Sequence, residues 1–415
     1  MRSNRPEPLV HPKRTESSLN PKRTVSTELP GLSKRPLKLE RPDNPERPVP
    51  LEKRFSRGIK LVVAMVVVLF VVLVIPVYGL RSQAPDPVSG GSVDANPNAE
   101  PSTIRISLVG DVNLADGWSI DVAAYHGDSV AAAFSPEILE HLQSADISYA
   151  NHEFTMSSRG EALEKYYIIR ADPSRVGYWK QMGVDIVGLG NNHAFDYGEE
   201  AFLDTLEILQ QNGIEYVGAG VNLAEAMAPA SFTFDGYTVA FVAADRSQKG
   251  DEVRAQQASE DSPGVLFCFE DELFLAAVAA AREEADFVIA LPHWGTEMST
   301  ELETVQVELA QKLIDAGADA VVGSHPHILQ GIEFYNGKLI AYSLGNFWFN
   351  DDYTPTMILD IEIVEGQARF RIVPALQTGQ QVLTSDEITA EVFGLMRELS
   401  PDIEIDNKGY ISSLL

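Results

Sequence analysis

Short apolar runs alternate with amphipathic stretches along most of the chain. Runs such as 238–242 and 286–291 are typical of buried strands, because a strand covered on both faces shows little polar alternation. Apolar residues spaced three and four apart predict helices between the runs, for example over 199–211, where Asn212-Gly213 forms a helix-ending signal. This alternation of strands and helices predicts a layered α/β fold.

The same patterns assign the other elements. We expect further strands over 104–109, 146–150, 185–189, 215–217, 318–322 and 338–343. We expect further helices over 136–145, 173–182, 270–284, 302–316 and 389–399. Glu365-Gly366 separates the runs 357–363 and 368–374, and so short a connection predicts an antiparallel hairpin. We therefore predict one domain over 103–384, with a C-terminal helix and polar tail over 385–415.

One apolar run is much longer than these strands. Residues 61–80 contain no charged residue, and about 20 apolar residues are what a helix needs to cross a bilayer. A cleaved signal peptide is the alternative, with Ser82-Gln83-Ala84 as its cleavage site. Signal peptides, however, have an apolar core of roughly 7–15 residues close to the N-terminus. We therefore predict a transmembrane helix over 59–80.

The charged residues divide the chain at the same place. Residues 1–60 hold 15 of the 32 basic and 7 of the 60 acidic residues, so this segment carries about +8 and the remainder about −36. The Pro- and Ser-rich composition of 1–58 predicts a disordered basic tail along the anionic inner leaflet. A Pro-, Gly- and Ser-rich stretch over 81–102 predicts a flexible linker.

Basic residues also flank the apolar run unequally. Only Arg81 lies close after it, whereas four basic residues lie close before it: Lys53, Arg54, Arg57 and Lys60. Because basic residues favour the cytoplasmic side of a spanning helix, this imbalance places residues 82–415 outside the membrane. The prediction is a single-pass cell-membrane protein with a cytoplasmic N-terminus and an extracytoplasmic domain.

Cys268 is the only cysteine, which excludes an intramolecular disulfide. Its neighbours, Phe267 and Phe269, indicate a buried apolar patch rather than a reactive thiol. A domain of about 300 residues buries enough surface to fold without a disulfide.

Polar clusters follow five of the predicted strands, and ligands bind at such strand ends in α/β sheets. The clusters contain five of the eight histidines, and a single such histidine is more often an ordinary surface or core residue. In chain order they are Gly110-Asp111-Val112-Asn113, Asn151-His152-Glu153, Gly190-Asn191-Asn192-His193, Pro292-His293-Trp294-Gly295-Thr296-Glu297 and Gly323-Ser324-His325-Pro326-His327.

The last cluster is the most informative of the five. His325 and His327 stand two residues apart between Gly and Pro, so both imidazoles can point at one centre or at two adjacent centres. Asp, Glu, Asn and His ligands without Cys favour Mn, Fe or Zn. The alternative for each carboxylate is a helix cap or a turn residue, and Asp196 in particular could begin the helix that follows it.

The motifs GDVN, NHE, GNNHAFDYG, PHWGTE and GSHPHILQGIEFYNGKLIAYSLGNFWF, spread over about 104–350, resemble the CapA family of capsule and poly-γ-glutamate biosynthesis proteins. The resemblance implies a calcineurin-like metallophosphoesterase sandwich on the outer face of the membrane. It also implies a catalytic imidazole at His193 and a catalytic role for Asp111. The metal ligands that it implies, for one or two divalent ions, are Asp111, Glu153, Asn192, His293, His325 and His327.

Three positions depart from the metallophosphoesterase pattern. Asp111-Val112-Asn113 stands where such enzymes have Asp-x-His, so one ligand is missing or replaced by a weaker amide. The second acidic motif is Asn-x-Glu, ending at Glu153, rather than Gly-Asp-x-x-Asp. His152 stands at a normally apolar position, as an extra ligand or a solvent-facing substitution. The segment 343–347 is expected to support the floor of the site.

Three functions remain open from the sequence. The first is synthesis, export or surface handling of an anionic capsular polymer, with poly-γ-glutamate expected. The second is metal-dependent hydrolysis of a phosphoester or of the polymer amide. The third is a non-catalytic accessory subunit of a polymer synthase complex. The expected partners are the membrane, the anionic polymer and other capsule synthase subunits, with no nucleic acid.

Overall fold

The computed structural model describes residues 103–115, 129–247, 255–350 and 352–415. The predicted cytoplasmic tail, transmembrane helix and linker, at 1–58, 59–80 and 81–102, lie outside these residues. Within the described ranges, no helix combines the length and the apolar character that a membrane crossing requires.

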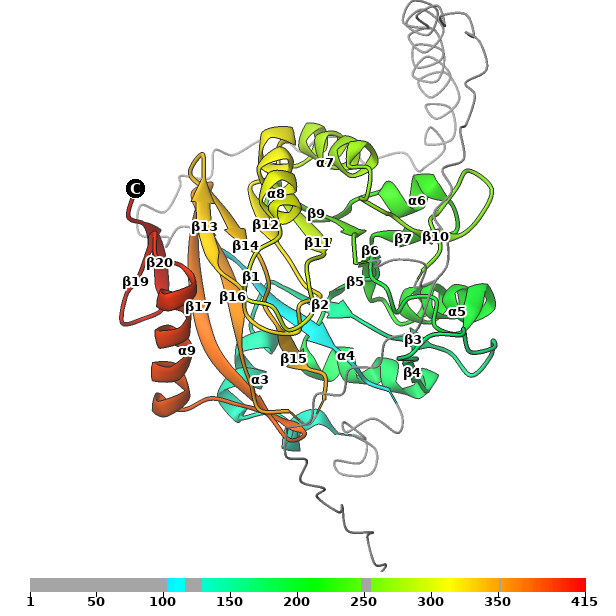
Figure 1. Ribbon diagram of the computed structural model, residues 1–415, viewed down its shortest axis with the longest axis horizontal. Helices are drawn as coiled ribbons and strands as arrows, with labels where there is room; N and C mark the ends of the chain where they lie inside the picture. Colours follow the sequence, from blue (N-terminus) through cyan, green and yellow to red (C-terminus); the bar gives the residue numbers. More distant parts are fainter. Residues whose placement is uncertain (1–102, 116–128, 248–254, 351) are drawn as a thin grey trace, which may run out of the picture. The chain divides into compact units, whose positions relative to one another are not determined.

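Two large β-sheets account for most strands of the described residues (Figure 1). The first runs in the order β19-β20-β17-β16-β1-β2-β5-β6, with β15 beside β1 and β18 beside β17. Its members are β1 (Thr103–Val112), β2 (Ile147–His152), β5 (Ile186–Gly188), β6 (Glu215–Val217), β15 (Asn346–Trp348), β16 (Thr354–Val364), β17 (Gln367–Thr378), β18 (Gln381–Leu383), β19 (Ile403–Ile405) and β20 (Tyr410–Ser413). Strands β1, β2, β5 and β6 are parallel, and β16 and β17 continue the sheet antiparallel.

The second sheet runs in the order β13-β14-β12-β11-β9-β8. Its members are β8 (Ala230–Phe234), β9 (Tyr237–Asp245), β11 (Phe287–His293), β12 (Ala320–Val322), β13 (Ile332–Tyr335) and β14 (Lys338–Ala341). The four inner strands are parallel, whereas β8 and β13 pair antiparallel at the edges. Two small ribbons complete the strands: β3 (Thr155–Met156) with β4 (Arg170–Ala171), and β7 (Ala219–Gly220) with β10 (Gly264–Val265).

Helices cover the outer faces of the two sheets (Figure 1). The first sheet packs against α3 (Pro136–Gln143), α4 (Val176–Met182) and α5 (Gly198–Gln211). The second packs against α6 (Leu223–Met227), α7 (Glu272–Glu284) and α8 (Thr304–Ala316). Helix α9 (Asp386–Leu399) lies against β17, and the short 3₁₀ turns are η1 (Val130–Ala132) and η2 (Pro173–Arg175).

The largest apolar layers lie between and outside the sheets. Ile106 and Leu108 of β1 meet Phe241 and Ile289 of the second sheet in a shared core, which holds the two sheets face to face. Phe202 of α5 belongs to a separate cluster on the outer side of the first sheet. Each Å² of apolar surface removed from water stabilises the folded state by about 25 cal/mol, so these layers are the main source of stability. The predicted layered α/β fold is confirmed.

The predicted hairpin is also confirmed, because β16 and β17 pair from Thr354 opposite Gln377 to Val364 opposite Gln367. Glu365 and Gly366, its two turn residues, have φ of 51° and 77°, as a two-residue hairpin turn requires. The strands that the sequence did not predict are mainly short ones or edge strands, including β8, β13 and β15. The tail after α9 is not merely polar, since β19 and β20 extend the first sheet.

Cys268 is fully buried in the cluster beneath α7 and α8, as its apolar neighbours indicated. Burial, with a smaller contribution from Asp245, raises the pKa of the Cys268 thiol. We expect Cys268 in the folded protein to resist a chromogenic disulfide reagent at pH 8 and to react fully in denaturant, because the thiolate is the nucleophile. Rapid labelling of the folded protein would contradict this buried position.

Candidate functional site

The polar clusters of both sheets meet at the carboxyl ends of the parallel strands. Asp111 and Glu153 come from the ends of β1 and β2, whereas His293 and His327 come from the ends of β11 and β12. His327 Nδ1 lies 3.3 Å from Asp111 Oδ2, and His293 Nε2 lies 3.7 Å from Glu153 Oε1. The site therefore joins the two sheets.

Gly110 explains how Asp111 reaches this position. A Cβ at Gly110 would lie 2.0 Å from the carbonyl oxygen of Gly345, so only glycine allows β1 and the segment before β15 to approach. The Asp111 amide donates to the same carbonyl at 2.9 Å. The pairing of β1 with β2 is irregular between Leu108 and Asp111, and irregularities of this kind redirect side chains next to functional sites.

The turn after β12 aims two imidazoles at the site. His325 and His327 have φ of 98° and 61°, a region that side chains other than glycine rarely adopt. The His325 amide donates to Asp111 Oδ2 at 3.3 Å, and Asn346 Oδ1 lies 2.8 Å from His327 Nδ1. The two imidazoles thus belong to two adjacent groups, His325 with Glu153 and His293, and His327 with Asp111 and Glu153.

Two groups of side chains could each hold a metal ion. Glu153, His293 and His325 form one group, and Asp111, Glu153 and His327 form the other. Within each group, one ligand atom from every member lies within 4.8 Å of the rest. Because Glu153 belongs to both groups, the arrangement suits two neighbouring ions that share one carboxylate.

The electrostatics of the two carboxylates fit a cation. Glu153 Oε1 is buried and accepts no hydrogen bond from the described residues. Burial, and then the charge of Asp111, raises the pKa of Glu153 well above its usual range. Burial opposes ionisation of Asp111 too, but the hydrogen bond and charge of His327 hold its pKa below the usual value. A divalent ion would compensate both charges, so the residues fit the metal that the resemblance implies.

Asn192 lies beside these groups, and its Oδ1 is 2.8 Å from His293 Nε2. The structure therefore brings together all six predicted ligands. Asn113 does not join them, because its Oδ1 accepts a hydrogen bond from the Ala115 amide at 2.8 Å. The position that differs from the Asp-x-His pattern thus supports a local turn.

His193 is oriented by Asp196. Its Nδ1 lies 2.6 Å from Asp196 Oδ2, and its Nε2 lies 4.0 Å from Glu153 Oε1. Burial lowers the pKa of His193 despite the opposing charge of Asp196. Asp196 also accepts hydrogen bonds from Lys165 Nζ at 2.5 Å and from the Ile169 amide at 2.7 Å. It is not the cap of α5, whose N-cap residue is Tyr197.

Neither sequence interpretation of His152 holds. Its side chain is fully buried, so it does not face solvent, and it belongs to neither metal-competent group. Its ring stacks on Phe154 at 3.7 Å between centroids and lies 5.5 Å from Trp179, on the opposite side of β2 from Asn151. Burial lowers the pKa of His152 to about 3.

We expect His152→Phe to keep the bound metal and to leave the melting temperature unchanged or higher. Among the described residues, neither ring nitrogen has a well-oriented hydrogen-bond partner, so phenylalanine removes buried polar atoms and keeps the aromatic packing. Metal analysis and thermal unfolding of the variant and the wild type test this. Loss of metal from His152→Phe would show that the imidazole is a ligand after all.

Sequence reasoning missed three supporting residues. Asn151 Nδ2 donates to Asp111 Oδ1 at 2.8 Å and to Glu153 Oε2 at 3.2 Å, thereby fixing both carboxylates. Its position two residues before Glu153, on the same face of an extended segment, was an available signal. Ser324 Oγ lies 2.9 Å from His293 Nδ1. No sequence signal pointed to Lys165, which reaches the site from an irregular segment.

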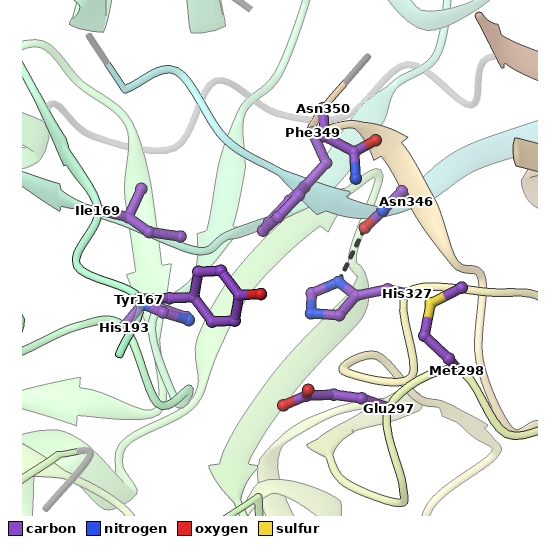
Figure 2. A pocket seen from close by; sticks show the side chains of 9 residues that line it. All are labelled: Tyr167, Ile169, His193, Glu297, Met298, His327, Asn346, Phe349 and Asn350. Carbon is purple, nitrogen blue, oxygen red and sulfur yellow. Dashed lines mark hydrogen bonds between the residues drawn. The ribbon is translucent and has the colours of Figure 1, made fainter. Parts of the chain in front are cut away.

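A cavity of about 210 Å³ opens beside the metal-competent groups (Figure 2). His193 and His327 line it, so substrate atoms in the cavity would be next to the site. Asn346, from the segment expected to form the floor, lines it as well. Its other lining residues are Tyr167, Ile169, Glu297, Met298, Phe349 and Asn350.

Known proteins similar to this chain agree with the earlier resemblance. The PGA biosynthesis protein CapA of Bacillus subtilis (strain 168) is 36% identical over 53% of this chain and 58% of its own length. The capsule biosynthesis protein CapA of Bacillus anthracis is 28% identical over 74% of this chain and 72% of its own length. The chain thus spans only part of these relatives.

A solved structure, the NAD nucleotidase of Haemophilus influenzae, is 14% identical over 72% of this chain and 57% of its own length, with a TM-score of 0.40. Structural similarity at this level does not assign the fold, so the calcineurin-like metallophosphoesterase fold stays a prediction. The family described as bacterial capsule synthesis protein PGA_cap matches residues 105–351, which include every residue of the site. Because this match covers more than half of the sequence, the chain belongs to the PGA_cap family.

Proposed function

We propose that this protein acts in the synthesis, export or surface handling of an anionic capsular polymer, with poly-γ-glutamate best supported, through metal-dependent hydrolysis at the site. The observation that carries the hydrolytic step is the pair of metal-competent groups that share the buried Glu153 beside an open cavity. The names of the relatives from the two Bacillus species support the polymer. The predicted anchor and outward orientation are part of the same proposal.

Each residue has a distinct part in this mechanism. Asp111, Glu153, Asn192, His293, His325 and His327 would hold the metal. Divalent ions supply Lewis acidity and lower the pKa of water, which suits hydrolysis of a phosphoester or an amide. His193, held through Nδ1 by Asp196, lines the cavity and would direct Nε2 toward the leaving group. It would move a proton to that group or donate a hydrogen bond to the reacting oxygen.

The net charge of the domain bears on how an anionic polymer is bound. Residues 61–415 carry about −36, so they would repel the polymer over roughly the Debye length of 8–10 Å. The metal ions are therefore the positive charges that would bring the polymer to the site. This explains why polymer binding should depend on metal.

A non-catalytic accessory role is the second candidate. It is favoured by Asn113, whose side chain closes a local turn where metallophosphoesterases have a ligand. The hydrolytic and the accessory role differ in whether the protein binds metal and hydrolyses a substrate. Full-length protein should be analysed for bound metal and assayed with a generic phosphodiester and with a γ-glutamyl polymer, with His325→Ala as the comparison. Absence of metal and of activity under every metal supplement would exclude hydrolysis and favour the accessory role.

The cellular role has a separate test. Deletion of the gene should remove or alter the surface polymer. A deletion strain with normal surface polymer would refute the biosynthetic proposal, whatever the protein hydrolyses in vitro.

We expect His193→Gln to lower the hydrolytic rate by about 10²–10⁴-fold while metal content stays at the wild-type level. His193 belongs to neither metal-competent group, so its loss should affect proton transfer rather than metal binding. Steady-state kinetics and metal analysis on the same preparations test this. His152→Phe, which changes a buried histidine outside the cavity, is the matched control and should keep its rate.

A further inference from the structure

The cavity beside the site has an unusual set of lining residues. Tyr167, Ile169, Met298 and Phe349 give it an apolar wall, and Glu297 brings a carboxylate (Figure 2). None of its described lining residues is Lys or Arg. An anionic group beyond the reacting centre would therefore meet a carboxylate and, among the described lining residues, no Lys or Arg with which to pair.

The nearest lysine on the same segment as Tyr167 is already engaged. Lys165 Nζ donates to the Asn192 carbonyl at 2.9 Å and to Asp196 at 2.5 Å, and its side chain is only 3% exposed. It fixes the segment that carries Tyr167 to the loop of His193. Lys165 thus positions the wall of the cavity and offers no charge to a substrate.

The opposite wall is held in a strained conformation. Met298 has φ of 56°, and its amide donates to the Pro326 carbonyl at 2.9 Å, which ties this segment to the histidine turn. Glu297 Oε1 consequently lies 3.9 Å from His325 Nε2, with 39% of its side chain exposed. The carboxylate thus lines the cavity next to the site, while part of its side chain stays exposed to solvent.

We propose that this cavity is a subsite for a protonated amino group of the substrate, with Glu297 as its ion-pair partner and the rings of Tyr167 and Phe349 against the carbon chain that bears it. A carboxylate flanked by aromatic faces is the chemistry that recognises an ammonium group. The inference rests on the proposed function. In a γ-linked glutamyl polymer, whose other charges are carboxylates, the free amino end is the one cationic group. The subsite would therefore select the amino end of the chain.

Binding of two short γ-glutamyl oligomers to the full-length, metal-supplemented protein tests the subsite by calorimetry. One oligomer has a free amino end, and the other is N-acetylated. Wild type should bind the free amine roughly tenfold more tightly or better, because a charge-assisted contact contributes this much. Glu297→Gln should remove most of that preference with unchanged metal content. Tyr167→Leu should weaken binding of the amine about twofold to fivefold.

Glu301→Gln is the matched control, since Glu301 is exposed on the same loop but does not line the cavity. It should keep the wild-type preference. Equal binding of the two oligomers, no binding of either, or a preference that survives in Glu297→Gln would overturn the subsite. Loss of metal from Glu297→Gln would overturn it too, because Glu297 would then be a ligand.

Hydrolysis of the same oligomers, measured separately, distinguishes this inference from the proposed function. Preferential binding of the amine without cleavage would support the subsite and refute hydrolysis. Equal binding together with equal cleavage of both oligomers would refute the subsite and leave hydrolysis standing.

Discussion

Glu153→Gln is expected to raise the melting temperature of the metal-free protein and to abolish the stabilisation that a divalent metal gives the wild type. In the metal-free protein, Glu153 Oε1 is a buried oxygen that accepts no hydrogen bond from the part of the chain that the structure describes, and it lies beside the carboxylate of Asp111. A neutral amide can donate to Asp111 and adds no second charge. Relief of an unsatisfied buried polar group corresponds to about 1–3 kcal/mol.

With metal bound, the wild type should become more stable than Glu153→Gln. A ligand that binds only the folded state stabilises it by about 2.7 kcal/mol at a concentration of 100 times its Kd. The wild type should gain this increment. Glu153→Gln should not, because the carboxylate shared by both groups is gone. Hydrolysis should fall by more than about 100-fold, since even supporting residues of metal sites have effects of 10–100-fold.

The advantage of Glu153→Gln in the metal-free protein should also depend on pH. Burial, followed by the charge of Asp111, raises the pKa of Glu153 well above its ordinary 4.5. A carboxyl with a raised folded-state pKa contributes stability below its unfolded pKa and loses it as the pH rises. The difference in unfolding free energy should therefore widen as the pH increases above about 4.5.

Thermal and denaturant unfolding with and without metal measure these effects. Glu301→Gln, at an exposed carboxylate, is the control: it should change neither the metal-free stability nor the stabilisation by metal. A metal-free Glu153→Gln protein less stable than the wild type would contradict the interpretation. So would stoichiometric metal binding by the variant.

Gly110→Ala is expected to destabilise the domain by about 3 kcal/mol or more and to remove metal binding. The new Cβ would lie 2.0 Å from the Gly345 carbonyl oxygen, which is backbone and cannot rotate away. Relief would require β1 to separate from the segment before β15. That movement would displace Asp111, whose amide donates to the same carbonyl.

Gly394→Ala is the matched control for this substitution. Gly394 is an exposed residue within α9, and a Cβ there would have no neighbour within 4 Å. Alanine is favoured over glycine in a helix, so this variant should be about 0.5–1 kcal/mol more stable than the wild type. Chemical denaturation compares both variants. Wild-type stability and metal content in Gly110→Ala would show that the strands can part without cost.

Much of the candidate site could be predicted because its residues follow strands directly. Asp111, Glu153, His293, His325 and His327 all stand at or just after the ends of strands whose apolar runs are visible in the sequence. Parallel strands bring their carboxyl ends to one edge, so local patterns were enough to place these side chains on the same side of a sheet. The structure brings all of the predicted ligands together, and metal binding itself stays a prediction.

The residues that escaped prediction act through long-range contacts. Lys165 lies in an irregular segment, and its role depends on Asp196, 31 positions away. For His152 the sequence predicted a site residue or a solvent-facing one, and the structure shows neither. Its place in the NHE motif indicated chemistry, but neighbouring residues of a strand face opposite sides, and its ring lies among Phe154 and Trp179.

The sequence by itself determined the order of strands and helices, the hairpin of β16 and β17, the buried state of Cys268 and the identity of the polar clusters. These depend on periodicity, turn residues and apolar runs, which act over a few residues. Only the tertiary structure decided how the two sheets pack, because that packing depends on the core shared between residues such as Leu108 and Ile289. The same packing joins Asp111 to a histidine turn more than 200 positions away and opens the cavity between Tyr167 and Glu297.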